Sequence, residues 1–325
     1  MGKAENKTFR AFEYSSGSEA NEDVQSACER QSRRYAMDLA RIYVLERKRV
    51  EELEIIRGHQ KRLQDEMNLA AALQKNLLPD PALLDGLSGA GLSIAAFSSP
   101  TSPVNGDFYH VRRSGSKVLI ALGDCKGHGV SAGMLTMAAH ALLDSMDFFK
   151  TPMEVASELD AWLKRTTLSA EFVAMTLALA DLDSGDVSLV GAGLPFPLIC
   201  RAGRGDALNG ILPAECVSQI EIAGPPIGIG SGLNRGCCTE IEMKPGDKLI
   251  LYSDGLTEST NAHGEFYGIP PDRIAALASV NRELCAREFK NALIRDWRSF
   301  KAGVECDDCT MLVLEKTRPL GAGSE

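Results

Sequence analysis

The chain has 325 residues, 44% of them hydrophobic and 24% charged, and a formal net charge of -9. The length and composition are those of a globular protein with one large domain and an extension. The acidic balance argues against a protein that binds the phosphate backbone of nucleic acids, and the longest mainly apolar run, 172–180, is far too short to span a membrane. Nine scattered cysteines without a secretory signal predict a cytoplasmic protein without disulfides.

Residues 1–34 are polar and charged without a hydrophobic period, which predicts a flexible N-terminal arm. Residues 35–79 are mostly strong helix formers and predict a long helix that ends at Pro79. Apolar residues recur at alternating spacings of four and three from Ile42 to Leu77, which indicates a coiled-coil seam with polar interruptions. This helix is therefore expected to form a homodimer and to transmit a signal. The alternative is an amphipathic helix that lies along its own domain.

Residues 80–318 alternate strand-like and helical runs, and 319–325 form a tail. Short turns at 113–116 and 183–186 have the composition of hairpin connections. Strands joined by hairpins, with helices between groups of strands, predict an α+β domain with antiparallel sheets.

Acidic residues stand at strand ends or in glycine-rich turns at four places: Asp107, Asp124, Asp254 and the pair Asp307 and Asp308. Each one alone is explained by the preference of Asp and Gly for turns. If the sheets bring them together, a counter-charge is needed, because crowded carboxylates would otherwise be protonated. Oxygen donors favour Mg²⁺ or Mn²⁺ over Zn²⁺, and two such ions can activate a water for attack at phosphorus. The pattern alone leaves both explanations open.

Five stretches, in order, resemble the motifs of PPM-type protein serine/threonine phosphatases, in their bacterial SpoIIE-like and RsbU-like branch. Among them are Gly-Asp-Cys-Lys-Gly-His-Gly at 123–129 and Tyr-Ser-Asp-Gly at 252–255. The five stretches are 103–109, 123–134, 251–261, 264–268 and 307–313. With a lead-in at 73–79 and a further match at 191–197, the resemblance covers about residues 68–316.

The resemblance implies an αββα four-layer sandwich of two antiparallel sheets flanked by helices, preceded by the long N-terminal helix. It implies two Mn²⁺ or Mg²⁺ ions at one edge. By position, Asp124 would bridge both ions and the backbone carbonyl of Cys125 would bind one, while Asp107, Asp254 and Asp307 would complete the ligand set. Catalysis would act through Asp107 and Asp124 by way of the ions and water.

Other residues of the motifs would support this site. Two glycines would let the backbone approach the site closely, and two more would allow the turn after Asp124. A histidine would point toward substrate or pack locally, and an aspartate would lie next to the ligand Asp307. They are, in that order, Gly106 and Gly255, Gly127 and Gly129, His128, and Asp308. Two positions depart from the family pattern: His110 stands where many relatives carry an acid, and Leu194 where a histidine is usual.

The resemblance further implies a metal-dependent phosphatase that acts on phosphoserine or phosphothreonine of a regulatory partner. That partner would be a STAS-domain anti-sigma-factor antagonist, and an upstream regulator would bind the N-terminal helix. Two alternatives stay open. One is a catalytically silent coiled-coil interaction module with a phosphatase-like domain, which predicts missing ligands. The other is a phosphohydrolase of small molecules.

Overall fold

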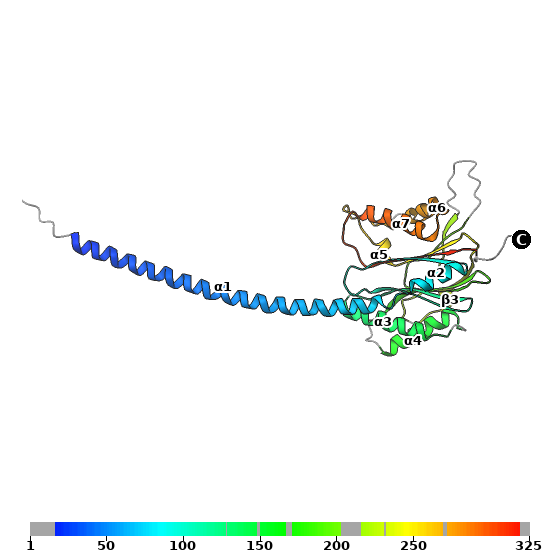
Figure 1. Ribbon diagram of the computed structural model, residues 1–325, viewed down its shortest axis with the longest axis horizontal. Helices are drawn as coiled ribbons and strands as arrows, with labels where there is room; N and C mark the ends of the chain where they lie inside the picture. The colour runs from blue at the N-terminus through cyan, green and yellow to red at the C-terminus, as the bar shows by residue number, and fades with distance from the viewer. Residues whose placement is uncertain are drawn as a thin grey trace, which may run out of the picture. The chain divides into compact units, whose positions relative to one another are not determined.

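The computed structural model describes residues 17–127, 129–147, 150–166, 171–202, 216–230, 232–268 and 272–318. The chain divides into two compact units, residues 1–64 and 65–325. Figure 1 shows its helices and strands. The helices are α1 (Gly17–Lys75), α2 (Pro81–Gly89), α3 (Val130–Ser145), α4 (Pro152–Thr166), η2 (Arg235–Cys237), α5 (Asp254–Thr257), α6 (Asp272–Val280) and α7 (Ala286–Lys301). The strands are β1 (Leu92–Ser99), β2 (Asp107–Ser114), β3 (Lys117–Cys125), β4 (Val173–Asp181), β5 (Asp186–Ala192), β6 (Leu198–Cys200), β7 (Val217–Gln219), β8 (Cys238–Glu242), β9 (Lys248–Tyr252) and β10 (Cys309–Lys316).

The N-terminal helix begins earlier than the sequence pattern predicts. Helix α1 starts at Gly17, so the predicted arm over 1–34 is wrong from residue 17 onward, and the rest of that arm lies outside the described residues. Residues 18–34 contain neither Gly nor Pro and are rich in Glu, Gln, Ala and Arg, which favour a helix without any apolar period. The compact second unit also begins at Asp65 and not at the predicted residue 80.

The part of α1 in the first unit exposes large apolar side chains, and each of them is more than half exposed. The residues are Tyr35, Met37, Leu39, Ile42, Tyr43, Val44, Leu45, Val50, Leu53, Ile55, Ile56 and Leu63. None of the described helices is long and apolar enough to cross a membrane.

The second unit is built on two five-stranded sheets, with strand orders β1-β10-β9-β6-β7 and β2-β3-β4-β5-β8. Neighbouring strands in both sheets are antiparallel. Helices α6 and α7 cover the outer face of the first sheet, and α3 and α4 cover that of the second (Figure 1). The predicted αββα sandwich, with its long N-terminal helix, is therefore confirmed.

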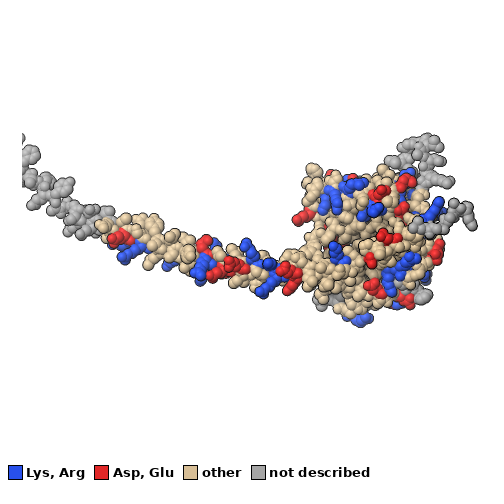
Figure 2. Space-filling model, in the orientation of Figure 1, with Lys and Arg blue, Asp and Glu red and all other residues tan. Residues whose placement is uncertain are grey.

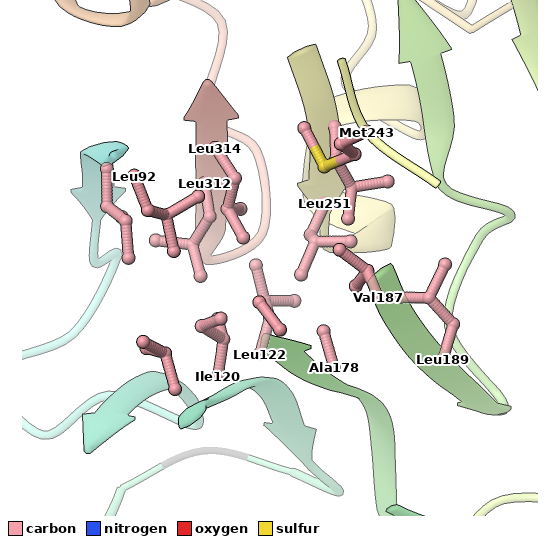
Figure 3. Packing of buried hydrophobic residues seen from close by; sticks show 14 of the residues in the cluster. Leu92, Ile120, Leu122, Ala178, Val187, Leu189, Met243, Leu251, Leu312 and Leu314 are labelled. Carbon is pink, nitrogen blue, oxygen red and sulfur yellow. The ribbon is translucent and has the colours of Figure 1, made fainter. Parts of the chain in front are cut away.

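Apolar side chains fill the space between the two sheets. Leu92, Leu251 and Leu312 of the first sheet face Ile120 and Leu122 of the second (Figure 3). Two further clusters lie between each sheet and its helices. Strands buried on both faces read as continuous apolar runs, which explains why β3 and β9 are recognisable in the sequence. This packing holds the ends of the two sheets together at the edge where the acidic residues lie.

Candidate metal centre

Asp107 and Asp124 lie directly opposite each other on neighbouring strands. Asp107 opens β2, and Asp124 is its register partner near the end of β3. The side chain of Asp107 is buried, and that of Asp124 is half-buried. Like charges that face each other across a sheet are destabilising. The fold therefore holds two acidic side chains next to each other at a cost in stability.

Three carboxyl groups at this edge, those of Asp107, Asp124 and Asp254, have raised pKa values. Burial, followed by the charge of Asp124, raises the pKa of Asp107 well above its usual value, although hydrogen bonds from Ser253 and Thr310 lower it. Burial and then the charges of Asp254, Asp307 and Asp308 raise the pKa of Asp124 to about 7. Burial and then Asp307 raise the pKa of Asp254. Among the described residues, none of the groups that shift these three pKa values is a cation.

Ser253 connects Asp107 to the opposite sheet. Its hydroxyl donates to Oδ2 of Asp107 at 2.7 Å and accepts the backbone N–H of Thr310 at 2.9 Å. Both Ser253 and Thr310 are fully buried. The other oxygen of Asp107, Oδ1, is buried without a hydrogen-bond partner. An unpaired buried carboxylate oxygen is costly unless a bound group accepts it as a ligand.

Backbone oxygens converge beside the same pair. A Cβ atom at Gly106 would lie 3.0 Å from the carbonyl oxygen of Cys125, 3.2 Å from that of Gly127 and 3.4 Å from Oδ1 of Asp124. Glycine at 106 therefore leaves open a space bordered by three oxygens. The predicted turn glycines, Gly127 and Gly129, adopt φ angles of +87° and +76°, in the left-handed region where glycine is favoured.

The two aspartates before β10 have different surroundings. Oδ1 of Asp308 accepts the backbone N–H and the hydroxyl of Thr101, both at 2.7 Å. Its Oδ2 accepts the backbone N–H of Gly106 at 3.0 Å. Asp308 is buried, whereas Asp307 is exposed. Within the described residues, the side chain of Asp307 accepts one hydrogen bond, from the backbone N–H of Asp308 to its Oδ1. Asp308 thus ties the loop before β2 to β10, which leaves Asp307 as the ligand candidate of the pair.

The donor set fits a hard divalent cation. In the described parts of the chain, no three His, Cys, Asp or Glu side chains are placed so that they could hold a metal ion by themselves. An ion here would therefore take backbone oxygens and water together with carboxylates, as Mg²⁺ commonly does. The unpaired Oδ1 of Asp107 and the oxygens around Gly106 are suited to this role. Asp254, at the start of α5, interacts electrostatically with Asp124 and Asp307.

Some predicted residues have other roles or cannot be placed. A Cβ at Gly255 would overlap the carbonyl oxygen of Asp308, so glycine there permits close backbone packing. His128 lies outside the described residues. His110 is buried against His140, with their Nδ1 atoms 3.3 Å apart. Leu194 belongs to the apolar cluster between the sheets.

Residue Gln74 is one that the sequence reading missed. Its Nε2 donates to the carbonyl oxygen of Asn105, and its Oε1 accepts the N–H of Asn105, both at 2.9 Å. The Oδ1 of Asn105 in turn accepts the N–H of Asp107 at 3.0 Å. The end of α1 is therefore connected to Asp107 through one residue. Gln74 lies in the lead-in stretch 73–79, and Ser253 and Thr310 lie inside the motifs at 251–261 and 307–313. The family resemblance therefore covers all three residues, although it did not predict what their side chains do.

The raised pKa values predict how stability depends on pH. A carboxyl group whose pKa is higher in the folded than in the unfolded protein stabilises the fold fully at a pH below its unfolded pKa of about 4. This stabilisation is lost as the pH rises through its pKa in the folded protein, which is about 7 for Asp124. Metal-free protein should therefore melt at a lower temperature at about pH 8 than at about pH 5.5. Mn²⁺ should raise the melting temperature more at the higher pH, because protons compete with it.

Differential scanning fluorimetry with and without Mn²⁺ measures both effects. Asp124→Asn is the control for other titrating groups, because it should reduce the difference between the two pH values. A metal-free protein whose melting temperature is equal at both pH values, or an Asp124→Asn variant with an unchanged difference, would contradict this prediction.

Comparisons with known proteins agree with this geometry. The family model described as Stage II sporulation protein E (SpoIIE) matches residues 114–317. Phosphoserine phosphatase RsbU of Bacillus subtilis is 23% identical over 215 residues, which are 66% of this chain and 60% of that protein. The chain spans less than two thirds of the length of the curated relatives it matches.

Solved structures share the fold. The SiaA-PP2C domain of Pseudomonas aeruginosa has a TM-score of 0.66 and 24% identity, over 79% of this chain and 98% of that domain. RsbX, solved in complex with magnesium, has a TM-score of 0.51 and 13% identity, over 70% of this chain and 96% of that chain. Both likenesses concern the fold, and the magnesium belongs to the RsbX structure.

Proposed function

The chain belongs to the SpoIIE family, and from that premise we propose that it is a metal-dependent protein phosphatase for phosphoserine or phosphothreonine. One observation carries the proposal: Asp124 lies opposite Asp107 and interacts electrostatically with Asp254 and Asp307, and no cation of the described residues is among the groups that shift the pKa values of Asp107, Asp124 and Asp254. A phosphatase-like module that had lost catalysis has no need to keep this costly arrangement. The relative RsbU, named a phosphoserine phosphatase, supports the same reaction class.

Two Mn²⁺ or Mg²⁺ ions are the cofactors we propose, with Asp124 between them. The backbone carbonyl of Cys125 would hold one ion, and Asp107, Asp254 and Asp307 would complete the ligand set. When bound, such ions supply a water activated for in-line attack at phosphorus and neutralise charge on the phosphate oxygens.

The chain's own residues position these donors. The Ser253 hydroxyl donates a hydrogen bond to Oδ2 of Asp107 and is itself held by the backbone N–H of Thr310, while Oδ1 of Asp107 has no hydrogen-bond partner. Burial raises the pKa of the Cys125 thiol to about 12, so this cysteine stays protonated and does not act as a nucleophile at neutral pH. Both features support a reaction in which water, and not a protein group, attacks phosphorus.

The substrate we propose is a phosphorylated STAS-domain anti-sigma-factor antagonist. The relationship to RsbU supports this choice by analogy, and the family match supports a role in sigma-factor control. All nine cysteines are free, which supports the cytoplasm as the compartment.

Helix α1 is proposed to form a coiled-coil homodimer and to receive an upstream regulator. The exposed apolar side chains of residues 35–63 support this, because a helix with so much apolar surface is stabilised by a partner. The bonds from Gln74 to Asn105 would relay the state of the helix to the neighbouring Asp107.

Replacing Gln74 by alanine tests this connection. We expect about a tenfold fall in Mn²⁺ affinity and in phosphatase activity, because supporting residues around metal ligands commonly contribute this much. Isothermal titration with Mn²⁺ and phosphate-release assays measure the two effects. Lys75→Ala, an exposed neighbour on the same helix, is the matched control. Unchanged Mn²⁺ affinity in Gln74→Ala would show that the helix end does not support the site.

Phosphate release separates the candidate functions. The substrates are a phosphoserine STAS-domain protein and a small aryl phosphate, each with and without Mn²⁺. Mn²⁺-dependent turnover of the phosphoprotein is the expected result. Turnover of the small phosphate alone would favour a small-molecule phosphohydrolase. Without turnover of either one, both enzyme functions would fail and the interaction module would stand.

A further inference from the structure

Helix α7 carries a row of positive charge on one flank. With about 100° per residue, its four basic residues on this flank fall within an arc of about 80°. They form what we call the basic stripe: Arg287, Lys290, Arg298 and Lys301. The acidic residues of the helix, Glu288 and Asp296, lie outside this arc, and Asp296 is paired with Arg273 at 3.0 Å. Figure 2 shows basic side chains over the α7 region.

The stripe lies along the outer strand of the first sheet. Strand β1 is at the end of the order β1-β10-β9-β6-β7. Lys290 Nζ donates to the carbonyl oxygen of Ala96 at 3.1 Å. The guanidinium of Arg298 lies over the Phe97 ring, 5.5 Å from its centroid. These contacts hold the ammonium of Lys290 and the guanidinium of Arg298 beside β1, and the side chains of Arg287 and Arg298 are exposed to solvent.

The cations of the stripe repel one another. Burial, followed by the charges of Arg287 and Arg298, lowers the pKa of Lys290. No acidic side chain is among the groups that shift it. A chain with a net charge of -9 has therefore concentrated positive charge on one flank of one helix. Such a concentration attracts an acidic partner over several ångströms.

Two contacts connect the basic stripe to residues next to the candidate metal centre. Phe97 is followed by Ser98, whose hydroxyl lies 3.4 Å from that of Thr310. At the end of the helix, Lys301 Nζ lies 3.2 Å from the sulfur of Cys306, the residue that precedes Asp307. A protein whose phosphorylated side chain reaches Asp307 therefore has the basic stripe beside it.

We propose that the basic stripe is the docking surface for an acidic face of the phosphoprotein substrate, next to its phosphorylated residue. This inference rests on the proposed phosphatase function. The carboxylate edge repels an anionic protein, and complementary charge beside it would orient that protein and speed its association. A competing role is protection of the free edge of β1, for which Lys and Arg are also suited. The two roles differ in whether substrate kinetics depend on the stripe.

The test uses the full chain with Mn²⁺ and two synthetic phosphoserine peptides of about 15 residues, which extend over roughly 50 Å. One peptide carries Asp and Glu around the phosphoserine, and the other carries Gln and Ser at those positions. Arg298→Glu should reduce the ratio of kcat/KM for the acidic to the neutral peptide by about tenfold, through KM. Arg295→Glu is the matched control, because Arg295 is exposed on the same helix outside the stripe. It should leave the ratio within about twofold.

A second measurement needs no variant. In the wild-type protein, raising salt from about 50 to about 300 mM should reduce the preference for the acidic peptide severalfold. An unchanged ratio in Arg298→Glu would overturn the docking role. If that variant does not fold, a wild-type protein without any preference for the acidic peptide at low salt would overturn it. Failure of the wild type to hydrolyse either peptide and a small aryl phosphate would instead refute the proposed phosphatase, and the docking role with it.

Discussion

Replacing Asp124 by asparagine is expected to reduce Mn²⁺-dependent phosphatase activity by about a thousandfold or more. Asp124 lies opposite Asp107 on the neighbouring strand and interacts electrostatically with Asp254 and Asp307, so it is linked to all three of the other proposed carboxylate ligands. Asparagine keeps the shape of the side chain and removes its charge. Both proposed ion positions should therefore be weakened by one substitution.

The same substitution is expected to raise the melting temperature of the metal-free protein at about pH 8. Burial and three neighbouring carboxylates raise the pKa of Asp124 to about 7, so its ionised form is unfavourable in the folded protein. Removing that charge relieves the repulsion. A variant that is inactive and more stable has lost an interaction kept for function, whereas a variant that is inactive and less stable has lost part of its fold.

Phosphate release and scanning fluorimetry measure the two effects on the same protein sample. Asp183→Asn is the matched control, because Asp183 is an exposed aspartate in the turn between β4 and β5. It should change neither activity nor melting temperature measurably. Activity of Asp124→Asn within about tenfold of wild type would refute the bridging role.

Replacing Gly255 by alanine is expected to lower the free energy of unfolding by about 3 kcal/mol or more. The new Cβ would overlap the carbonyl oxygen of Asp308 and lie 3.3 Å from the Cα of Cys309. Both contacts are with backbone atoms, which cannot rotate away as a side chain can. The chain entering β10 would have to move, and Asp308 would be displaced from Thr101 and Gly106.

Urea unfolding measures this loss, and Mn²⁺ titration measures whether the displaced loop still supports the site. Gly86→Ala is the control, because a Cβ at Gly86 in helix α2 meets nothing within 4 Å. That variant should be neutral or more stable by up to about 1 kcal/mol. A Gly255→Ala protein as stable as wild type would show that the backbone can accommodate a Cβ at position 255 without overlap with the carbonyl oxygen of Asp308.

The fold class and the family could be predicted from the sequence. Buried strands such as 117–123 are short apolar runs, and the acidic motifs stand at their ends, so both are visible without coordinates. The four candidate carboxylates could be named for the same reason. The start of α1 could not be predicted from its pattern, because residues 18–34 form a polar helix with no apolar period to mark it.

Which side chains come into contact could not be predicted from the sequence and is seen in the folded protein. Asp107 and Ser253 are 146 positions apart, and Thr101 and Asp308 are 207 apart, yet each pair is joined by a hydrogen bond. Such contacts depend on strand register and on the packing of two sheets, and neither leaves a periodic signal in the sequence. The same reason applies to Gln74 and Asn105 and to the basic stripe beside β1. The sequence specifies each strand by its own burial, and the distances between strands follow only when the whole sandwich is packed.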